Sequence, residues 1–208
     1  MKNTIAAKRH LLAIMAHPDD AEMWVGGTLA KHARTGRASI LIACDDPIRT
    51  REAEAGAAIL GTELRVTTGG PLLFETCLEV IGTTAADVVI CHRWDDPHPD
   101  HRRIGMLVTG VVQKAAIILR KRIHLYVCDT YESLTLDSRV PGSAIVNVDD
   151  SFDVKMSALQ AHVSQPLSHF SSMAERQART WGARIGATWA EAFDPVPVLG
   201  LLPGRDAL

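Results

Sequence analysis

The stretch LLAIMAHPDD, residues 11–20, joins a short apolar run to a cluster of histidine and carboxylate side chains. A short apolar run of this kind is typical of a strand buried on both faces of a parallel sheet. In open α/β sheets, ligands bind beyond the carboxyl ends of the strands. We therefore expect residues 11–15 to form a central strand that delivers His17, Asp19 and Asp20 to a functional site.

A second cluster of similar composition, His98-Pro99-Asp100-His101, follows another apolar run at residues 87–91. If the two strands are neighbours, both clusters face one crevice at the same edge of the sheet. Two histidines and one carboxylate are a suitable ligand set for Zn²⁺ and equally for Fe²⁺. A further carboxylate beside the metal can accept the proton of a bound water molecule. The two clusters together favour a metal-dependent hydrolase, and the alternative is a non-catalytic α/β binding module in which they only cap helices.

Apolar runs and helical stretches alternate along the chain, which predicts an open, mostly parallel sheet with helices on both faces. We expect Asp100 to be the N-cap of the long helix that follows it. A surface loop that forms a lid or substrate rim is expected at residues 129–142, and an extended arm at residues 196–208. The expected strands are 11–15, 38–44, 64–66, 87–91, 123–128 and 144–148, and the expected helices are 26–34, 51–60, 72–81, 101–119, 154–162 and 172–192.

The length and composition favour a single globular domain that spans residues 1–208. Of its 208 residues, 47% are hydrophobic, which is sufficient for a substantial core. The formal net charge of −2 argues against a nucleic-acid or membrane-surface partner, because such partners usually require a clustered basic face. No apolar run reaches the roughly 18 residues of a membrane span, and the start lacks the apolar region of a signal peptide. We therefore expect a cytoplasmic protein whose four cysteines, none in a C-x-x-C pair, are reduced and mostly buried.

Both motifs also resemble those of a known family. The segment 16–22, followed by Gly26-Gly27-Thr28, and the H-P-D-H cluster with Asp96 in front of it resemble the signature of the PIG-L/LmbE-type N-acetylglucosaminyl deacetylases. Weaker similarities extend over most of the chain, at residues 51–61, 131–132, 161–162 and 190–193.

The resemblance implies a fold, a reaction and a role for each cluster residue. The fold would be a Rossmann-like α/β domain, and the substrate a small N-acetylated amino sugar that is hydrolysed to a free amine and acetate. Zinc would be held by His17, Asp20 and His101. Asp19 would be the general base, and His98 would act as general acid or oxyanion stabiliser. A homo-oligomer would be consistent with this family.

Two further residues, Arg51 and Asp96, are predicted to bind substrate. Arg51 would contact a substrate oxygen, or else be a solvated charge in the first turn of a helix. Asp96 would orient a ligand histidine through its second ring nitrogen, or else be a turn residue beside Pro97. The other histidines receive no functional role: His162 is expected to pack or lie at the surface, and His10, His32, His92, His124 and His169 have no partner motif.

The sequence does not identify the substrate. Trp24 and Val25 stand where small residues are common in the family, which would narrow or reshape the crevice. The alternative substrate is therefore another amide or a thiol-conjugate amide. We expect Gly26 and Gly27 to permit close helix–strand packing, and Trp181 and Trp189 to be core residues on one helix.

Overall fold

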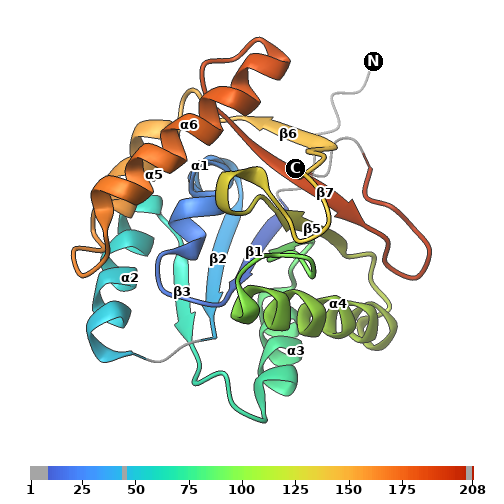
Figure 1. Ribbon diagram of the computed structural model, residues 1–208. Coiled ribbons are helices and arrows are strands. Elements are labelled where there is room, and N and C mark those ends of the chain that lie inside the picture. Colours follow the sequence, from blue (N-terminus) through green and yellow to red (C-terminus); the bar gives the residue numbers. More distant parts are fainter. Residues whose placement is uncertain (1–8, 44–45, 205–207) are drawn as a thin grey trace.

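The computed structural model describes residues 9–43, 46–204 and 208, which form one seven-stranded sheet flanked by helices (Figure 1). The strand order is β3-β2-β1-β4-β5-β7-β6. Strands β1 to β5 run parallel, and β7 pairs antiparallel with both β5 and β6. The predicted mostly parallel α/β fold is therefore confirmed. The strands are β1 (His10–Met15), β2 (Arg37–Ile42), β3 (Glu63–Val66), β4 (Val88–Cys91), β5 (His124–Cys128), β6 (Ala144–Asn147) and β7 (Ala190–Val196).

Helices cover both faces of the sheet. One face packs against α1, α2, α5 and α6, and the other face packs against α3 and α4. A short 3₁₀ turn, η1 (Tyr131–Ser133), follows β5. The helices are α1 (Asp20–Thr35), α2 (Pro47–Leu60), α3 (Leu73–Thr84), α4 (Pro99–Leu119), α5 (Phe152–Leu159) and α6 (Leu167–Ile185). No helix of the described segments is long and apolar enough to span a bilayer.

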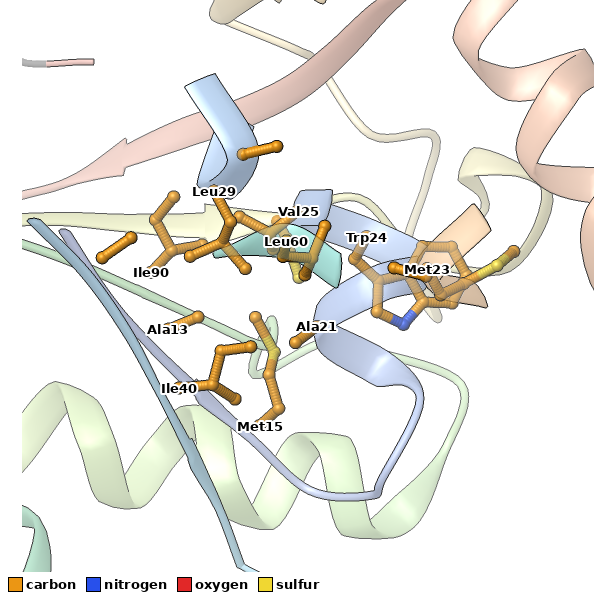
Figure 2. Packing of buried hydrophobic residues seen from close by; sticks show 14 of the residues in the cluster. Ala13, Met15, Ala21, Met23, Trp24, Val25, Leu29, Ile40, Leu60 and Ile90 are labelled. Atoms are coloured by element: carbon orange, nitrogen blue, oxygen red, sulfur yellow. The ribbon is translucent and has the colours of Figure 1, made fainter. Parts of the chain in front are cut away.

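The central strand β1 is buried along its whole length, as its apolar sequence predicts. Because side chains alternate along a strand, Ala13 and Met15 pack toward α1, whereas Leu12 and Ile14 pack toward α3 and α4. Figure 2 shows the first of these two layers, where Ala13 and Met15 lie with Ile40, Ile90 and the α1 residue Leu29. This two-sided burial fixes the position of β1, and thereby that of the polar cluster at its end.

The predicted helix 172–192 is wrong in its last part. Helix α6 ends at Ile185, where Gly186 adopts a left-handed φ of 73°, and residues 190–196 form strand β7. Trp189 therefore does not share a helix with Trp181, and its ring stacks on Phe152 at a centroid distance of 3.9 Å. Ala and Glu are good helix formers, but strand pairing of residues 190–192 with β6 outweighs that intrinsic preference.

Five helices begin earlier than predicted, among them α5 at Phe152 and α6 at Leu167. Helix α1 starts at Asp20, so Gly26 and Gly27 lie inside it rather than at its start. Helix α2 starts at Pro47 and α4 at Pro99. The predicted N-cap Asp100 is wrong, because His98 is the cap and its Nδ1 accepts a hydrogen bond from the Asp100 backbone N–H at 3.2 Å.

The two glycines of α1 permit close packing, although against different elements from those expected. A Cβ at Gly27 would lie 2.8 Å from the Val148 side chain, and one at Gly26 would lie 3.0 Å from Lys155 of α5. Both values are below ordinary van der Waals contact, so side chains here would push α1 away from its neighbours.

Two smaller expectations have mixed outcomes. Cys77, Cys91 and Cys128 are free and buried, as predicted, and burial raises the pKa of the Cys77 thiol to about 12. Cys44 lies outside the described residues.

The extended arm expected at residues 196–208 is wrong in its described part, because that segment folds back onto α4. There the Leu199 N–H donates to Gln113 Oε1 at 2.7 Å, and residues 198 and 201 form an antiparallel bridge.

Candidate metal-dependent active site

Strands β1 and β4 deliver the two polar clusters to the same edge of the sheet. The strands pair in parallel, with Ile14 opposite Cys91, so their carboxyl ends coincide. The H-P-D-D cluster connects β1 to α1, and the H-P-D-H cluster forms the N-terminus of α4. The expectation that both clusters face one crevice is met, although a long stretch of sequence separates them.

The assembled side chains offer two overlapping groups of possible metal ligands. His17, His98 and His101 form one group and Asp20, His92 and His101 the other, with one ligand atom from each residue lying within 4.8 Å of the rest of its group. The predicted set of His17, Asp20 and His101 is divided between the two groups.

Its members are nevertheless adjacent to one another. Asp20 Oδ2 lies 3.3 Å from His17 Nδ1, and Asp20 Oδ1 lies 3.3 Å from His101 Nε2. The Nε2 atom of His101 is buried and has no hydrogen-bond partner of good geometry among the described residues. An unsatisfied buried nitrogen beside a carboxylate fits a cation that would complete its coordination.

Asp20 is held in its ionised form. Burial alone would raise the pKa of its carboxyl group, but the neighbouring His101 and His92 hold that pKa well below its ordinary value. Its Oδ2 also accepts a hydrogen bond from the His17 backbone N–H at 2.7 Å. A fixed anionic oxygen between imidazoles is the donor type that a divalent cation requires.

Asp19 stands in a strained conformation at the start of α1. Its φ of 130° is one that residues other than glycine rarely adopt, and such strain costs of order 1–3 kcal/mol and is concentrated at functional sites. The backbone oxygen of Asp19 accepts from Met23 N at 2.9 Å. Its Oδ1 accepts from Arg49 Nη2 at 3.0 Å, and the same Nη2 donates to Pro18 O at 2.9 Å. These contacts fix the carboxylate at the mouth of the ligand cluster.

The environment of Asp19 also tunes its basicity. Burial and the adjacent charge of Asp20 raise its pKa to about 7, against the opposing effect of Arg49. A carboxylate with a pKa near neutrality is suited to accept and release a proton.

Asp96 was predicted to bind substrate, but it does not line the pocket. It lies behind the ring of His101. Its fully buried Oδ2 is 3.2 Å from His101 Nδ1, and its Oδ1 accepts from the His98 backbone N–H at 2.8 Å. Burial would lower the pKa of His101, but Asp20 and Asp96 raise it to about 10. The geometry matches the other interpretation of Asp96, in which it orients a ligand histidine through its second ring nitrogen.

Arg51 is exposed and lies outside the pocket lining, so the structure does not bring it to the site. Arg49, two residues earlier, lines the pocket and pairs with Asp19. The difference arises because α2 begins at Pro47, where Asp46 caps it by accepting from the backbone N–H of residues 48 and 49. This cap places Arg49 in the first turn, where its guanidinium reaches Pro18 and Asp19.

His92 was missed by the sequence analysis. It is fully buried, and its Nε2 lies 3.1 Å from both Ala16 N and Asp20 Oδ2. Its ring stacks on His101 at a centroid distance of 3.8 Å and an interplanar angle of 13°. His92 directly follows β4, so the carboxyl-end rule that identified His17 could have identified it as well.

His162 was expected either to pack in the interior or to lie at the surface, and the structure places it in the interior. It is fully buried with Glu22, and His162 Nε2 is 3.4 Å from Glu22 Oε2. Gly56 of α2 leaves room for this pair, because a Cβ there would overlap Glu22 and lie 3.2 Å from His162 Nε2. His162 belongs to neither ligand group.

A pocket of about 180 Å³ opens above the cluster. One wall is aromatic, where Trp24 and Tyr131 meet edge to face at a centroid distance of 5.2 Å and an interplanar angle of 79°. Tyr131 comes from the predicted loop at residues 129–142, which therefore does reach the site. The lining residues are His17, Asp19, Asp20, Met23, Trp24, Arg49, His98, Tyr131, Gln165 and Phe170.

The sequence matches one known family over its first half. Residues 12–112 match the family described as "PIG-L: GlcNAc-PI de-N-acetylase". The match includes every residue of both polar clusters and ends within α4.

A curated relative supports this assignment over a shorter stretch. The chain is 42% identical over 41 residues to 1D-myo-inositol 2-acetamido-2-deoxy-alpha-D-glucopyranoside deacetylase 1 of Saccharopolyspora erythraea. That stretch is 20% of this chain and 14% of the relative, so most of the relative's length is not matched.

Solved structures share the fold of this chain over nearly its whole length. Conserved protein TT1542 of Thermus thermophilus has a TM-score of 0.77 at 23% identity, covering 90% of this chain and 94% of that one. The N,N'-diacetylchitobiose deacetylase of Pyrococcus horikoshii has a TM-score of 0.72 at 22% identity, and the match covers 92% of this chain and 85% of that one. GalB of Pseudomonas putida KT2440, a 4-carboxy-2-hydroxymuconate hydratase, has a TM-score of 0.76 at 17% identity, and the match covers 91% of this chain and 96% of that one. At these identities the likeness establishes the fold alone.

Proposed function

We propose that this PIG-L-type protein is a divalent-metal-dependent deacetylase that hydrolyses the N-acetyl group of a small amino sugar or its conjugate. The observation that carries the proposal is the position of Asp19. Its carboxylate, with a pKa raised to about 7, lines a pocket beside a cluster of His and Asp side chains that fits a divalent cation. The family match and the deacetylases among its relatives support this reaction over other uses of the same fold.

In this proposal His17, Asp20 and His101 hold the metal, which is zinc or ferrous iron. When bound, a metal of this kind lowers the pKa of a coordinated water and polarises the substrate carbonyl. Asp96 fixes the ring of His101 from behind, and His92 packs on its face, so that the ligand histidine cannot rotate.

Asp19 accepts the proton of the attacking water, and Arg49 keeps the carboxylate oriented for that task. His98 donates a hydrogen bond to the acyl oxygen of the substrate. Its Nδ1 accepts from the Asp100 backbone N–H, so the proton of the neutral ring is on Nε2. Partial burial and the neighbouring His101 and His17 lower the pKa of His98, which keeps its ring neutral at neutral pH. His98 therefore fits a hydrogen-bond donor to the oxyanion better than a strong acid.

The pocket wall favours a sugar as the group that carries the acetamide. The wall is formed by Met23, Trp24, Tyr131 and Phe170, whose apolar surfaces can cover the C–H face of a pyranose ring. Trp24 makes this wall bulky beside Asp20, one of the proposed metal ligands. The hydratase GalB shares the fold, so the reaction has to be tested directly.

The deciding experiment is a screen for amine release with the metal-loaded protein. The panel contains N-acetylglucosamine, N,N'-diacetylchitobiose, an N-acetylglucosaminyl inositol, N-acyl thiol conjugates and a hydratase substrate. We expect release of acetate and a free amine from an acetamido sugar, loss of activity with a chelator, and recovery with Zn²⁺ or Fe²⁺. Turnover of the thiol conjugates alone would redirect the proposal to another amide, and hydration alone would refute it.

His101→Ala is expected to remove most of the metal-binding affinity. His101 belongs to both ligand groups, and its side chain contacts Asp20. Competition with a chromophoric chelator should show affinity reduced by at least about 100-fold. His169→Ala, on the outer helix α6, is the control and should keep its metal. Metal retention by the His101 variant at normal affinity would contradict the ligand assignment.

Arg49→Gln is expected to lower kcat/KM for amine release by about tenfold or more, because the Asp19 carboxylate loses its fixed partner. Arg51→Gln changes the same charge one half-turn away on an exposed face, and we expect a value within twofold of the parent. Equal effects of the two substitutions would show that Arg49 acts only through overall charge.

A further inference from the structure

A second hollow, separate from the pocket above the cluster, lies between the segment after β5 and helix α6. Its volume is about 240 Å³. In Figure 1 the segment after β5 lies in front of α1 and beside α6, and α6 and η1 are in contact. We call this hollow the arginine groove, and its lining residues are Glu132, Ser133, Arg139, Val140, Arg176, Gln177, Thr180, Trp181 and Arg184.

The groove concentrates positive charge in a protein whose net charge is −2. Three arginines line it, and Glu132 is the sole acidic residue among the lining residues. Glu132 is already engaged, because its Oε1 accepts from Arg176 Nη2 at 2.6 Å. Among the described residues, no carboxylate pairs with Arg139 or Arg184. The groove therefore carries an excess of two positive charges without internal compensation.

One guanidinium group of the groove rests on a rigid floor. Arg184 lies over the ring of Trp181, with its Cζ 4.1 Å from the ring centroid. Trp181 is buried, and its Nε1 donates to Asp129 Oδ2 at 2.6 Å. A planar guanidinium stacked on a fixed aromatic ring keeps its N–H donors free and loses little conformational freedom when it binds an anion.

The charge of Asp129 beneath this floor does not neutralise the groove. Asp129 is buried, does not line the hollow, and accepts hydrogen bonds from donors within the fold: Thr130 N, Ser133 Oγ, Gln177 Nε2 and Trp181 Nε1. It also lies near the cationic Arg93. The carboxylate is thus satisfied from inside, and the arginines of the groove face solvent.

The groove is connected to the pocket through one turn of chain. Tyr131 lines the pocket, whereas the next two residues, Glu132 and Ser133, line the groove. Both have left-handed φ values, 51° and 54°, and the turn is held by Ser133 Oγ, which donates to Asp129, and by Gln177, which donates to Thr130 O at 2.7 Å. This turn sends consecutive side chains to opposite sides.

We propose that the arginine groove binds a phosphate-type oxyanion. Arginine forks match the oxygens of such an anion, and the hollow has room for one phosphate group together with water. The anion is either an acidic substituent of a larger ligand or a free anion, and both share this chemistry. The proposal does not depend on the reaction assigned to the pocket.

The test is a titration of the full-length, metal-free protein with inorganic phosphate, followed by the backbone amide signals of Glu132, Ser133, Arg139 and Arg184. We expect saturable shifts of these four signals. Arg139→Gln and Arg184→Gln should each weaken binding about three- to tenfold, and Glu132→Gln should strengthen it several-fold, because it frees Arg176.

Arg179→Gln is the matched control. Arg179 is an exposed arginine of the same helix, its guanidinium lies over Trp189 at 4.4 Å, and it does not line the groove. Its affinity for phosphate should stay within twofold of the parent. Non-saturable shifts, or equal weakening by Arg179→Gln and Arg184→Gln, would overturn the proposal.

A second titration, with a phosphorylated N-acetyl hexosamine, distinguishes the two sources of the anion. A ligand that spans groove and pocket should shift the indole signal of Trp24 and the amide of Tyr131 in addition to the groove signals. A free anion site should give the groove shifts alone. Absence of groove shifts with both probes would refute the site.

Discussion

Asp19→Asn is expected to lower kcat for amine release by about 10²- to 10⁴-fold while the metal content stays unchanged. Asn has the shape of Asp but cannot accept the proton of the attacking water. It can still accept the hydrogen bond from Arg49, so the turn at residues 17–20 should keep its conformation. Asp19 belongs to neither ligand group, which is why the metal should remain. Steady-state kinetics and metal analysis on the same sample measure the two effects separately.

Two comparisons make this result decisive. Asp153→Asn, at an exposed carboxylate on α5, should leave kcat within twofold. His101→Ala should lose both metal and activity, in contrast to Asp19→Asn, which loses activity alone. An Asp19 variant that turns over at the parental rate would remove the general base from the proposed mechanism, and one that loses its metal would move Asp19 into the ligand set.

Glu191→Ala is expected to reduce the free energy of unfolding by about 3–5 kcal/mol. Glu191 is a buried carboxylate of β7, and its Oε1 accepts from Lys155 Nζ at 2.7 Å. It also accepts from the backbone N–H groups of Gly27 and Thr28 and from the Thr28 hydroxyl, at 2.7–2.9 Å. The substitution therefore leaves a buried ammonium group and several α1 donors without an acceptor. Urea unfolding followed by circular dichroism measures the loss.

Neighbouring substitutions separate burial from charge. Lys155→Met should cost less than Glu191→Ala, because Glu191 then keeps its three donors in α1. Asp150→Ala breaks the pair with Arg34, which is also 2.7 Å long and also involves α1, but both partners are exposed. We expect a cost below about 1 kcal/mol there. A Glu191 variant no less stable than the Asp150 variant would show that the buried pair contributes nothing to stability.

Much of the fold could be predicted because its signals are local. The apolar runs at residues 11–15 and 87–91 have the length and composition of buried strands, and the structure has strands at both. The carboxyl-end rule then placed the two polar clusters together without any knowledge of distances. That part of the site depends on topology, and the topology of alternating strands and helices is highly restricted.

The parts that could not be predicted depend on long-range contacts. Residues 190–192 read as a helix because Ala and Glu favour one, but strand pairing with β6 decides their conformation. The burial of Glu191 is invisible in the sequence, because its partners lie in α1 and α5. Arg49 could not be identified, because the expected helix 51–60 begins four residues later than α2 and therefore leaves Arg49 outside it.

The family segment has a related limit. It ends at residue 112, whereas Tyr131, Gln165 and Phe170 of the pocket lie beyond it. The ligand cluster is therefore encoded in the first half of the chain, and much of the pocket wall in the second. Assignment of the chemistry and assignment of the substrate rest on different parts of the sequence.

The position of β7 has a consequence for biosynthesis. This strand is made after β6 but inserts between β5 and β6, so the sheet cannot close while the ribosome is still translating residues before 190. Until then β6 has no neighbouring strand, the edge of β5 is unpaired, and Lys155 lacks its ion-pair partner Glu191. A nascent chain stalled upstream of β7 would expose that edge to other polypeptides, so holdase chaperones should bind such chains and release them once β7 has been made.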